Sequence, residues 1–302
     1  MKKIFLKVVF VVLSVTFGAL LSSCSAHKAA LQSSNWQGEA YQQDSALQGS
    51  RAQVFFFPNY KLTGRERILD IGSGVGNITA EFAARLKHGS ILGVDKSQSM
   101  VDKASQTFPQ SQYPNLSFEQ ADAQDKNFYL GHQNEFDWVV SFSCLHWVKD
   151  HEAVFEGISR VLKNGGRTYL FYASTGGDPL AEIANEMTKE EQWAPYFASF
   201  HDGVFRFDEK DYARMFKQKR LPFKIIKMKQ VKLQEVVAGR EELIAYNRSW
   251  VQQLHRLPTD ALKNQFLAQL VDNYLEKYPA GPDGKIKVVD HYIEVVLEKS
   301  RI

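Results

Sequence analysis

The sequence predicts an α/β domain with a doubly wound, mostly parallel sheet, and two observations carry this prediction. Between residues 68 and 173, short apolar runs alternate with amphipathic stretches of helical periodicity. A glycine-rich turn also joins the first apolar run to a helical stretch. Strands buried on both faces read as continuous apolar runs, and right-handed crossovers place the connecting helices on both sides of the sheet.

The first half of the domain is expected to alternate strands with helices. The expected strands lie at residues 68–71, 90–95, 116–119 and 136–142, with a last one after a turn at 163–166 that runs to Ala173. The expected helices lie at residues 39–60, 81–86, 97–107 and 153–162. Runs of this length that are rich in Val, Ile, Leu and aromatic residues favour buried strands.

After Ala173 the pattern changes to longer amphipathic segments. Helices are expected at residues 181–187, 211–219, 241–255 and 260–278, and strand-like runs at 223–236 and 287–297. An edge hairpin interrupted by helices within residues 240–278 accounts for this order. We therefore expect one domain over residues 39–302, with a ligand-binding core at 60–173 and a substrate or lid region at 174–302.

The N-terminus reads as a signal peptide over residues 1–23. Lysines precede an uncharged, mostly apolar run of 14 residues from Val8 to Leu21, and a membrane-spanning helix needs about 20. The Leu-Ser-Ser-Cys ending at Cys24 resembles a bacterial lipobox. This resemblance implies cleavage before Cys24, lipidation of its thiol and a membrane-anchored lipoprotein, in the outer membrane if the cell is Gram-negative.

Residues 24–38 are small and polar, as a tether between lipid and domain is expected to be. The alternative is an unprocessed signal-anchor in which Cys24 has no role, and a chain whose signal is not processed is expected in the cytoplasm. Neither alternative changes the prediction for the domain that follows.

Charge and cysteine content exclude several classes of function. Removal of residues 1–23 takes away three lysines and no acid, which leaves 34 basic and 34 acidic residues. A neutral chain has no electrostatic footprint for nucleic acid. With Cys24 lipidated, Cys144 is the one thiol left, so neither an intramolecular disulfide nor a cysteine metal cluster is expected. We expect Cys144 to pack near the end of a buried strand.

The glycine turn predicts a nucleotide-type cofactor site. Three glycines follow Asp70 at alternate positions: Gly72, Gly74 and Gly76. Glycine permits both the backbone bend and the close approach of a ligand, and the first N–H groups of the following helix stay free to bind it. The spacing differs from the dinucleotide fingerprint, which has two residues before its last glycine.

Two further acids are expected at the same edge of the sheet. Asp95 ends the second expected strand, where a carboxylate can accept hydrogen bonds from both ribose hydroxyls. Asp122 follows the third strand, where it can meet an adenine amino group. Ligands of open α/β sheets bind outside the carboxyl ends of the strands, and parallel strands bring these ends together.

Four segments in the correct order resemble the motifs of class I S-adenosylmethionine-dependent methyltransferases. They are Ile68–Gly76, Gly93–Met100, Ala121–Ala123 and Leu162–Gly166. The resemblance covers residues 68–173 and implies a seven-stranded, Rossmann-like fold with S-adenosylmethionine as cofactor and no metal. The residues expected to bind the cofactor are Asp70, Gly72, Gly74, Gly76, Asp95, Asp122, Ala123 and Ser141.

Two more segments, residues 41–48 and 141–148, resemble juvenile hormone acid O-methyltransferases and, less closely, trans-aconitate methyltransferases. The resemblance implies methylation of a carboxylate, with Gln48 and Trp147 holding the acid beside the methyl donor. An amide and an indole N–H are suitable donors for that anion. The alternatives are a solvated Gln48 and a Trp147 that is only an apolar anchor. His146 is expected to be structural or to support the residues that touch the substrate, since carboxylate methylation needs no general base.

The acceptor is expected to be a small or medium apolar carboxylic acid, with helices 240–278 as a lid. Several aromatic residues could line an acyl pocket or belong to the core: Trp193, Tyr196, Phe197, Phe200, Phe205, Phe207 and Trp250. One alternative function is methylation of a lipid or quinone-like hydroxyl, which needs a base and which substitution of His146 tests. Another is a lipoprotein that keeps the fold as a binding module, because S-adenosylmethionine is a cytosolic metabolite and the signal directs the domain outward.

Overall fold

The computed structural model describes residues 51–301. The signal peptide, Cys24, the tether and Gln48 lie outside the described residues, so the predictions made for them stay predictions. Within residues 51–301 no helix is long and apolar enough to cross a membrane.

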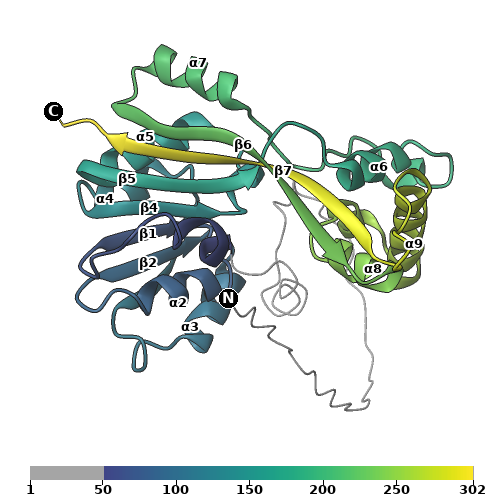
Figure 1. The fold of residues 1–302 in the computed structure, drawn as a ribbon, viewed down its shortest axis with the longest axis horizontal. Helices are drawn as coiled ribbons and strands as arrows, with labels where there is room; N and C mark the ends of the chain where they lie inside the picture. The colour runs from purple at the N-terminus through teal and green to yellow at the C-terminus, as the bar shows by residue number, and fades with distance from the viewer. Residues whose placement is uncertain (1–50, 302) are drawn as a thin grey trace, which may run out of the picture. The chain divides into compact units, whose positions relative to one another are not determined.

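Seven strands of the described part form one sheet in the order β3-β2-β1-β4-β5-β7-β6 (Figure 1). The strands are β1 (Arg67–Ile71), β2 (Ser90–Asp95), β3 (Leu116–Gln120), β4 (Phe136–Phe142), β5 (Leu162–Ala173), β6 (Phe223–Val237) and β7 (Ile286–Lys299). Strands β1 to β5 pair in parallel, and β7 pairs antiparallel with both β5 and β6. The predicted mostly parallel sheet and the predicted edge hairpin are therefore confirmed.

Helices cover both faces of this sheet. The helical elements are η2 (Ala52–Phe56), α2 (Asn77–Ala83), α3 (Gln98–Thr107), α4 (Lys126–Gly131), η3 (Leu145–Trp147), α5 (His151–Val161), α6 (Pro179–Met187), η4 (Ala194–Tyr196), α7 (Glu209–Lys219), α8 (Arg240–Arg248), η5 (Gln252–Arg256) and α9 (Asp260–Lys277). Successive residues of a strand point to opposite faces. Accordingly, Leu69 of β1 packs in the cluster with α4, α5 and α7, whereas Ile68 packs in the cluster with η2 and α2.

The β6–β7 hairpin is longer than the other strands and reaches past the core of the sheet. Figure 1 shows α6, α8 and α9 gathered around the far end of this hairpin, away from β1 and β2. These helices share an apolar cluster of their own with Val237 and Ile286, which pair at the end of the hairpin where β7 begins. The hairpin thus joins the parallel sheet to a separate helical cluster.

Three local expectations differ from the structure. Of the expected helix 39–60, the described part holds only the short π-helix η2, and Pro58 lacks the N–H that a continuing helix needs. The expected turn at 163–166 is a bulge inside β5, where Gly165 has a φ of 79°. The expected helix 241–255 ends at Arg248, because the Asn247 and Ser249 side chains donate to carbonyls of the last turn.

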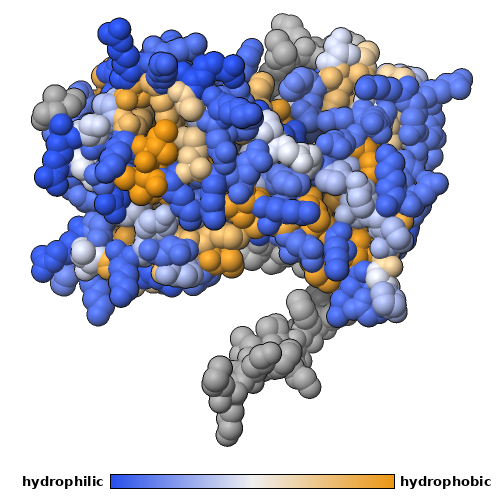
Figure 2. All heavy atoms as spheres, turned by 45° about the horizontal axis from the view of Figure 1, so that its top comes forward, coloured by the Kyte–Doolittle hydropathy of each residue, from blue (hydrophilic) through white to orange (hydrophobic). Residues whose placement is uncertain are grey.

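Most of the face shown in Figure 2 is hydrophilic, with small apolar areas between the polar side chains. The exposed large apolar side chains of the described part include Ile225 and Ile226 of β6, the edge strand. Lysines at positions 224 and 227 flank these two isoleucines, and further lysines follow at positions 229 and 232 of the same strand. Such charges oppose pairing with another chain.

Candidate active site

The turn between β1 and α2 has the backbone that its glycines predict. Gly72, Gly74 and Gly76 have φ values of 77°, 55° and 85°, in the left-handed region that favours glycine. A Cβ on Gly72 would lie 2.1 Å from the Cys144 Sγ. The segment that follows β4, residues 143–148 and here called the β4 loop, therefore packs directly against the turn. This contact gives Cys144 the packing role expected from the sequence, and burial raises the pKa of its thiol.

Two carboxylates hold the turn in place. Asp70 is buried, and its Oδ2 accepts a hydrogen bond of 2.7 Å from the Thr79 hydroxyl of α2. Burial raises the pKa of Asp70 to about 7, and the nearby Asp95 adds to the rise. Asp95 accepts hydrogen bonds from the backbone N–H groups of Gly74, at 3.0 Å, and Ser97, at 2.9 Å. Asp95 thus links the glycine turn to the start of α3.

The turn keeps polar groups that suit a polar ligand. The Ser73 hydroxyl is buried and has no hydrogen-bond partner among the described residues. The first N–H groups of α2 point out of the helix, as at any helix start. An unpaired buried hydroxyl, a glycine backbone and a strand-end carboxylate together fit a nucleoside-like molecule better than a packed core.

The other residues expected to bind a cofactor lie near this edge in different environments. Burial alone would raise the pKa of Asp122, but an ion pair of 2.8 Å with Lys96 and hydrogen bonds from Gln124 lower it. The Ala123 carbonyl accepts from Tyr129. Ser141 is fully buried and donates to the Ile71 carbonyl of β1. Its hydroxyl therefore stabilises the strand pair.

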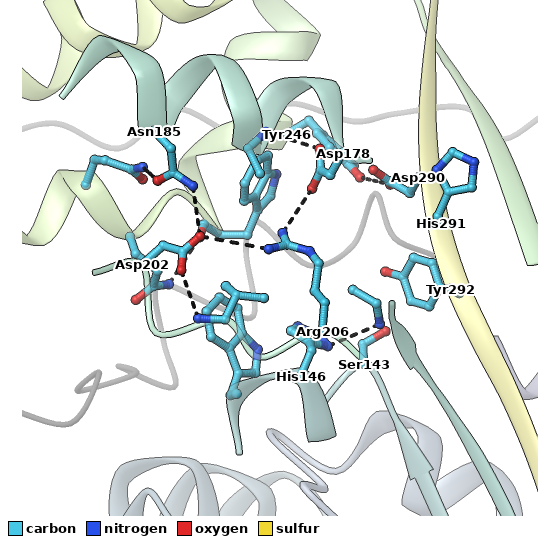
Figure 3. Close-up of a pocket in the computed structure, with 17 residues that line it drawn as sticks. Ser143, His146, Asp178, Asn185, Asp202, Arg206, Tyr246, Asp290, His291 and Tyr292 are labelled. Carbon is cyan, nitrogen blue, oxygen red and sulfur yellow. Dashed lines mark hydrogen bonds and ion pairs between the residues drawn. The ribbon is translucent and has the colours of Figure 1, made fainter. Parts of the chain in front are cut away.

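A cavity with about 90 Å³ of internal space opens beside the β4 loop. At the roughly 10–15 Å³ that one water needs by this measure, it has room for a small organic molecule. Its walls come from the β4 loop, the end of β5, α6, the loop before α7, α8, η5 and β7 (Figure 3). The lining residues are Ser143, His146, Trp147, Ala173, Asp178, Ala181, Asn185, Asp202, Val204, Arg206, Tyr246, Trp250, Gln252, Gln253, Asp290, His291 and Tyr292.

His146 and Trp147 line the cavity two and three residues after Cys144, which packs on Gly72 of the glycine turn. The Nδ1 of His146 accepts a hydrogen bond of 3.3 Å from the Ala173 backbone N–H. Burial, with the charge of Arg206, lowers the pKa of His146 to about 3. The ring is therefore neutral with its proton on Nε2, and it is suited to donate a hydrogen bond rather than to accept a proton.

The opposite wall carries three carboxyl groups and one guanidinium. Figure 3 shows Arg206 extending between His146 on one side and Asp178 and Asp202 on the other. Asp290 accepts a hydrogen bond of 3.0 Å from the Tyr246 hydroxyl. Burial, followed by repulsion from Asp178, raises the pKa of Asp290 to about 7.

This wall was not foreseen from the sequence. Residues 178, 206 and 290 come from segments without a recognisable motif, and only the Asp-Pro pair at 178–179 signals a helix start. Of the aromatic residues considered for an acyl pocket, Trp250 alone lines the cavity. Trp193 and Phe197 are buried in the helical cluster, Tyr196 and Phe200 pack against it, and Phe207 packs under α7. Charged and amide side chains therefore share the cavity lining with apolar surface.

Comparisons with known proteins agree with the geometry at the glycine turn. Residues 68–166 match the family model of a methyltransferase domain. A protein of Invertebrate iridescent virus 6 that carries a methyltransferase name is 27% identical over 239 residues, which span 79% of this chain and 85% of that protein.

Two enzymes of known acceptor are similar over shorter stretches. Juvenile hormone acid O-methyltransferase of Drosophila melanogaster is 28% identical over 45% of this chain and 46% of that enzyme. Trans-aconitate 2-methyltransferase of Deinococcus radiodurans is 34% identical over 33% of this chain and 35% of that enzyme. The chain thus matches less than half of either enzyme's length.

Solved structures support the fold. Phosphoethanolamine N-methyltransferase 2 of Haemonchus contortus, in complex with S-adenosyl-L-methionine, superposes with a TM-score of 0.55 at 18% identity. The superposition covers 87% of this chain and 57% of that one. At this identity the likeness concerns the Rossmann-like fold alone.

Proposed function

We propose that this chain, a methyltransferase by its domain at residues 68–166, transfers the methyl group of S-adenosylmethionine to a carboxylate of a small polar acid. Two parts of the described structure support the proposal. One is the glycine turn with its strand-end carboxylates, and the other is the cavity with charged side chains on its wall. The cavity lining leads us to propose a polar acid in place of the apolar acid expected from the sequence.

The residues at the turn suit S-adenosylmethionine. Asp95 is placed to accept from the ribose hydroxyls, and the backbone of Gly72 to Gly76 allows close approach of the amino acid part. Asp122 has a carboxylate at the edge where the adenine amino group is expected. The bound cofactor supplies an activated methyl group on a sulfonium with a neutral leaving group, so the protein has to orient the acceptor and exclude water.

The donors on the cavity wall beside the turn suit a carboxylate acceptor. The neutral His146 can donate its Nε2–H, and Ser143 and Trp147 line the same wall. Hydrogen-bond donors of this kind can hold one carboxylate oxygen while the other stays free to attack. The role proposed for Gln48 completes this set and remains a prediction.

The protonation state of His146 favours a carboxylate over a hydroxyl group as the methyl acceptor. A hydroxyl acceptor has to lose its proton to a base, and His146 is the titratable side chain among the residues after β4 that line the cavity, Ser143, His146 and Trp147. With Nδ1 bonded to the Ala173 N–H and its pKa lowered to about 3, His146 does not act as that base near neutral pH. A carboxylate is already ionised at that pH and needs no base.

A hydroxyl acceptor is the second candidate, and Asp290 favours it. A carboxyl group with a pKa near 7 that lines the cavity has the properties of a general base. In that reaction Asp290 would take the proton of the hydroxyl group while Tyr246 orients the carboxylate.

Incubation of the full chain with methyl-labelled S-adenosylmethionine and a panel of small acids and alcohols tests the proposal. We expect transfer of label to acids, in a product that mild alkali converts back to the acid with release of labelled methanol. An alkali-stable methyl ether, abolished in Asp290→Asn but not in His146→Gln, would favour the second candidate instead.

A further inference from the structure

Arg206 is the single Lys or Arg among the described residues, 51–301, that line the cavity. It comes from the loop between η4 and α7, and its side chain is only 24% exposed. Figure 3 shows its guanidinium directed across the cavity toward Asp178 and Asp202. An arginine with little access to solvent needs partners for its five N–H donors.

The described residues do not supply these partners at hydrogen-bond distance. The guanidinium nitrogens lie 3.9 Å from the Asp178 Oδ2 and 3.9 Å from the Asp202 Oδ2. Hydrogen bonds from N–H to oxygen span about 2.7–3.2 Å. Arg206 is therefore held by charge between two acids while its donors stay available.

The two acids are engaged elsewhere. Asp202 accepts from the Val204 backbone N–H at 3.1 Å and from the Asn185 amide at 3.0 Å. Asp178 accepts from the Ala181 backbone N–H at 3.2 Å, as the N-cap of α6. These bonds fix the carboxylates on the cavity wall, and through them the position of the Arg206 head group.

Trp250 lines the same cavity and carries a second N–H donor. The Trp250 Nε1 is buried and has no hydrogen-bond partner in the part of the chain that the structure describes. A buried N–H without an acceptor is unfavourable unless a ligand supplies one. Arg206 therefore has donors available to an acceptor from outside the chain, and the Trp250 Nε1–H lacks an acceptor within the described residues.

We propose that Arg206, assisted by Trp250, binds a second anionic group of the methyl acceptor, such as a second carboxylate. This inference rests on the proposed function and adds the substrate class to it. The group on Arg206 is not the one that is methylated, because a guanidinium that engages both carboxylate oxygens lowers their nucleophilicity. The reacting carboxylate instead meets the weaker donors near the glycine turn.

Other charged groups on the walls bear on this assignment. Asp178, Asp202, Asp290, His146 and His291 all line the cavity. Burial raises the pKa of Asp178 and of Asp290, so these carboxyl groups can take up a proton when an anion enters. A protonated carboxyl group donates a hydrogen bond to an anion.

Three probes of similar length differ in the group at their second end, which is a carboxylate in glutarate, a methyl group in butyrate and an ammonium group in 4-aminobutyrate. Their binding to the full chain is measured by calorimetry with and without S-adenosylhomocysteine, and methyl transfer to each is measured with labelled S-adenosylmethionine. We expect glutarate to bind most tightly. In Arg206→Gln we expect glutarate affinity to fall about tenfold or more, with unchanged S-adenosylhomocysteine affinity. Arg206→Lys should recover part of the loss, and Trp250→Phe should show a smaller loss.

Arg214→Gln is the matched control, because Arg214 lies on the exposed side of α7 with a side chain 64% exposed. It should leave all three affinities unchanged. No saturable glutarate binding to the wild type, an equal affinity for butyrate, or a tighter affinity for 4-aminobutyrate would each overturn the inference. If glutarate binding depends on Arg206 but no methyl is transferred, the proposed function fails and the anion site stands.

Discussion

Asp290 is a buried carboxyl group in the cavity whose ionised form is destabilised by its surroundings. Its carboxylate is desolvated, lies near Asp178 and Glu235, and is only partly compensated by the Tyr246 hydroxyl and the charge of Arg51. The pKa near 7 therefore lies well above the usual value of about 4 for an aspartic acid in an unfolded chain. Functional sites commonly carry such groups, because a ligand can complete what the fold leaves unbalanced.

This shift predicts how stability changes with pH. Between about pH 4 and pH 7 the folded chain holds the Asp290 proton more tightly than the unfolded chain, so the free energy of unfolding falls as pH rises through this window. Asp290→Asn should reduce the fall without abolishing it, since Asp70 and Asp178 also have raised pKa values. Urea unfolding at a series of pH values from 5 to 8 measures this fall in the free energy of unfolding.

The control for this series is Asp260→Asn, because the Asp260 side chain is 92% exposed. It should follow the wild-type profile. An Asp290→Asn profile as steep as that of the wild type would contradict the account of this carboxyl group.

Among the elements, α7 supports the cavity through a chain of hydrogen bonds. The Tyr172 hydroxyl of β5 donates to the Tyr212 hydroxyl of α7 at 2.6 Å. Tyr212 donates to the His151 Nδ1 at 2.7 Å, and the His151 Nε2–H donates to the Leu145 carbonyl at 2.8 Å. The last bond fixes η3, the short turn that carries His146 and Trp147.

Tyr212→Phe should therefore weaken both the fold and the site. The substitution leaves the Tyr172 hydroxyl without its acceptor and the His151 Nδ1 without its donor, and unsatisfied buried groups cost about 1–3 kcal/mol of the free energy of unfolding. We also expect a raised KM for the acceptor with unchanged cofactor affinity. Tyr278→Phe, at an exposed position, is the control, and equal stability and KM for both variants would rule this role out.

The elements near the glycine turn could be predicted from the sequence, and the cavity could not. The runs at 90–95 and 136–142 form β2 and β4 at the predicted bounds, because uninterrupted apolar runs specify buried strands. The cavity brings together residues from α6, α8, η5, β7 and an irregular loop. Their meeting depends on how the helical cluster packs, which local periodicity does not encode.

At the scale of the whole molecule, the β6–β7 hairpin joins the sheet that carries the glycine turn to the helical cluster that contributes to the cavity. The strand ends of the parallel sheet present the glycine turn. At the far end of the hairpin, α8, η5 and the turn between them supply Tyr246, Trp250 and Gln253 to the cavity. Within the segment expected as a lid, residues 240–278, only α8, η5 and the turn between them contribute lining residues. Acceptor specificity can change in these helices without disturbing the turn.

The central claim is that the glycine turn binds S-adenosylmethionine, and a calorimetric titration of the full chain with this compound tests it most directly. We predict saturable binding at one site with roughly micromolar affinity, lost in Asp95→Ala and kept in Asp102→Ala, a matched change on the exposed face of α3. No saturable binding to the wild type, or equal binding to Asp95→Ala, would contradict the account.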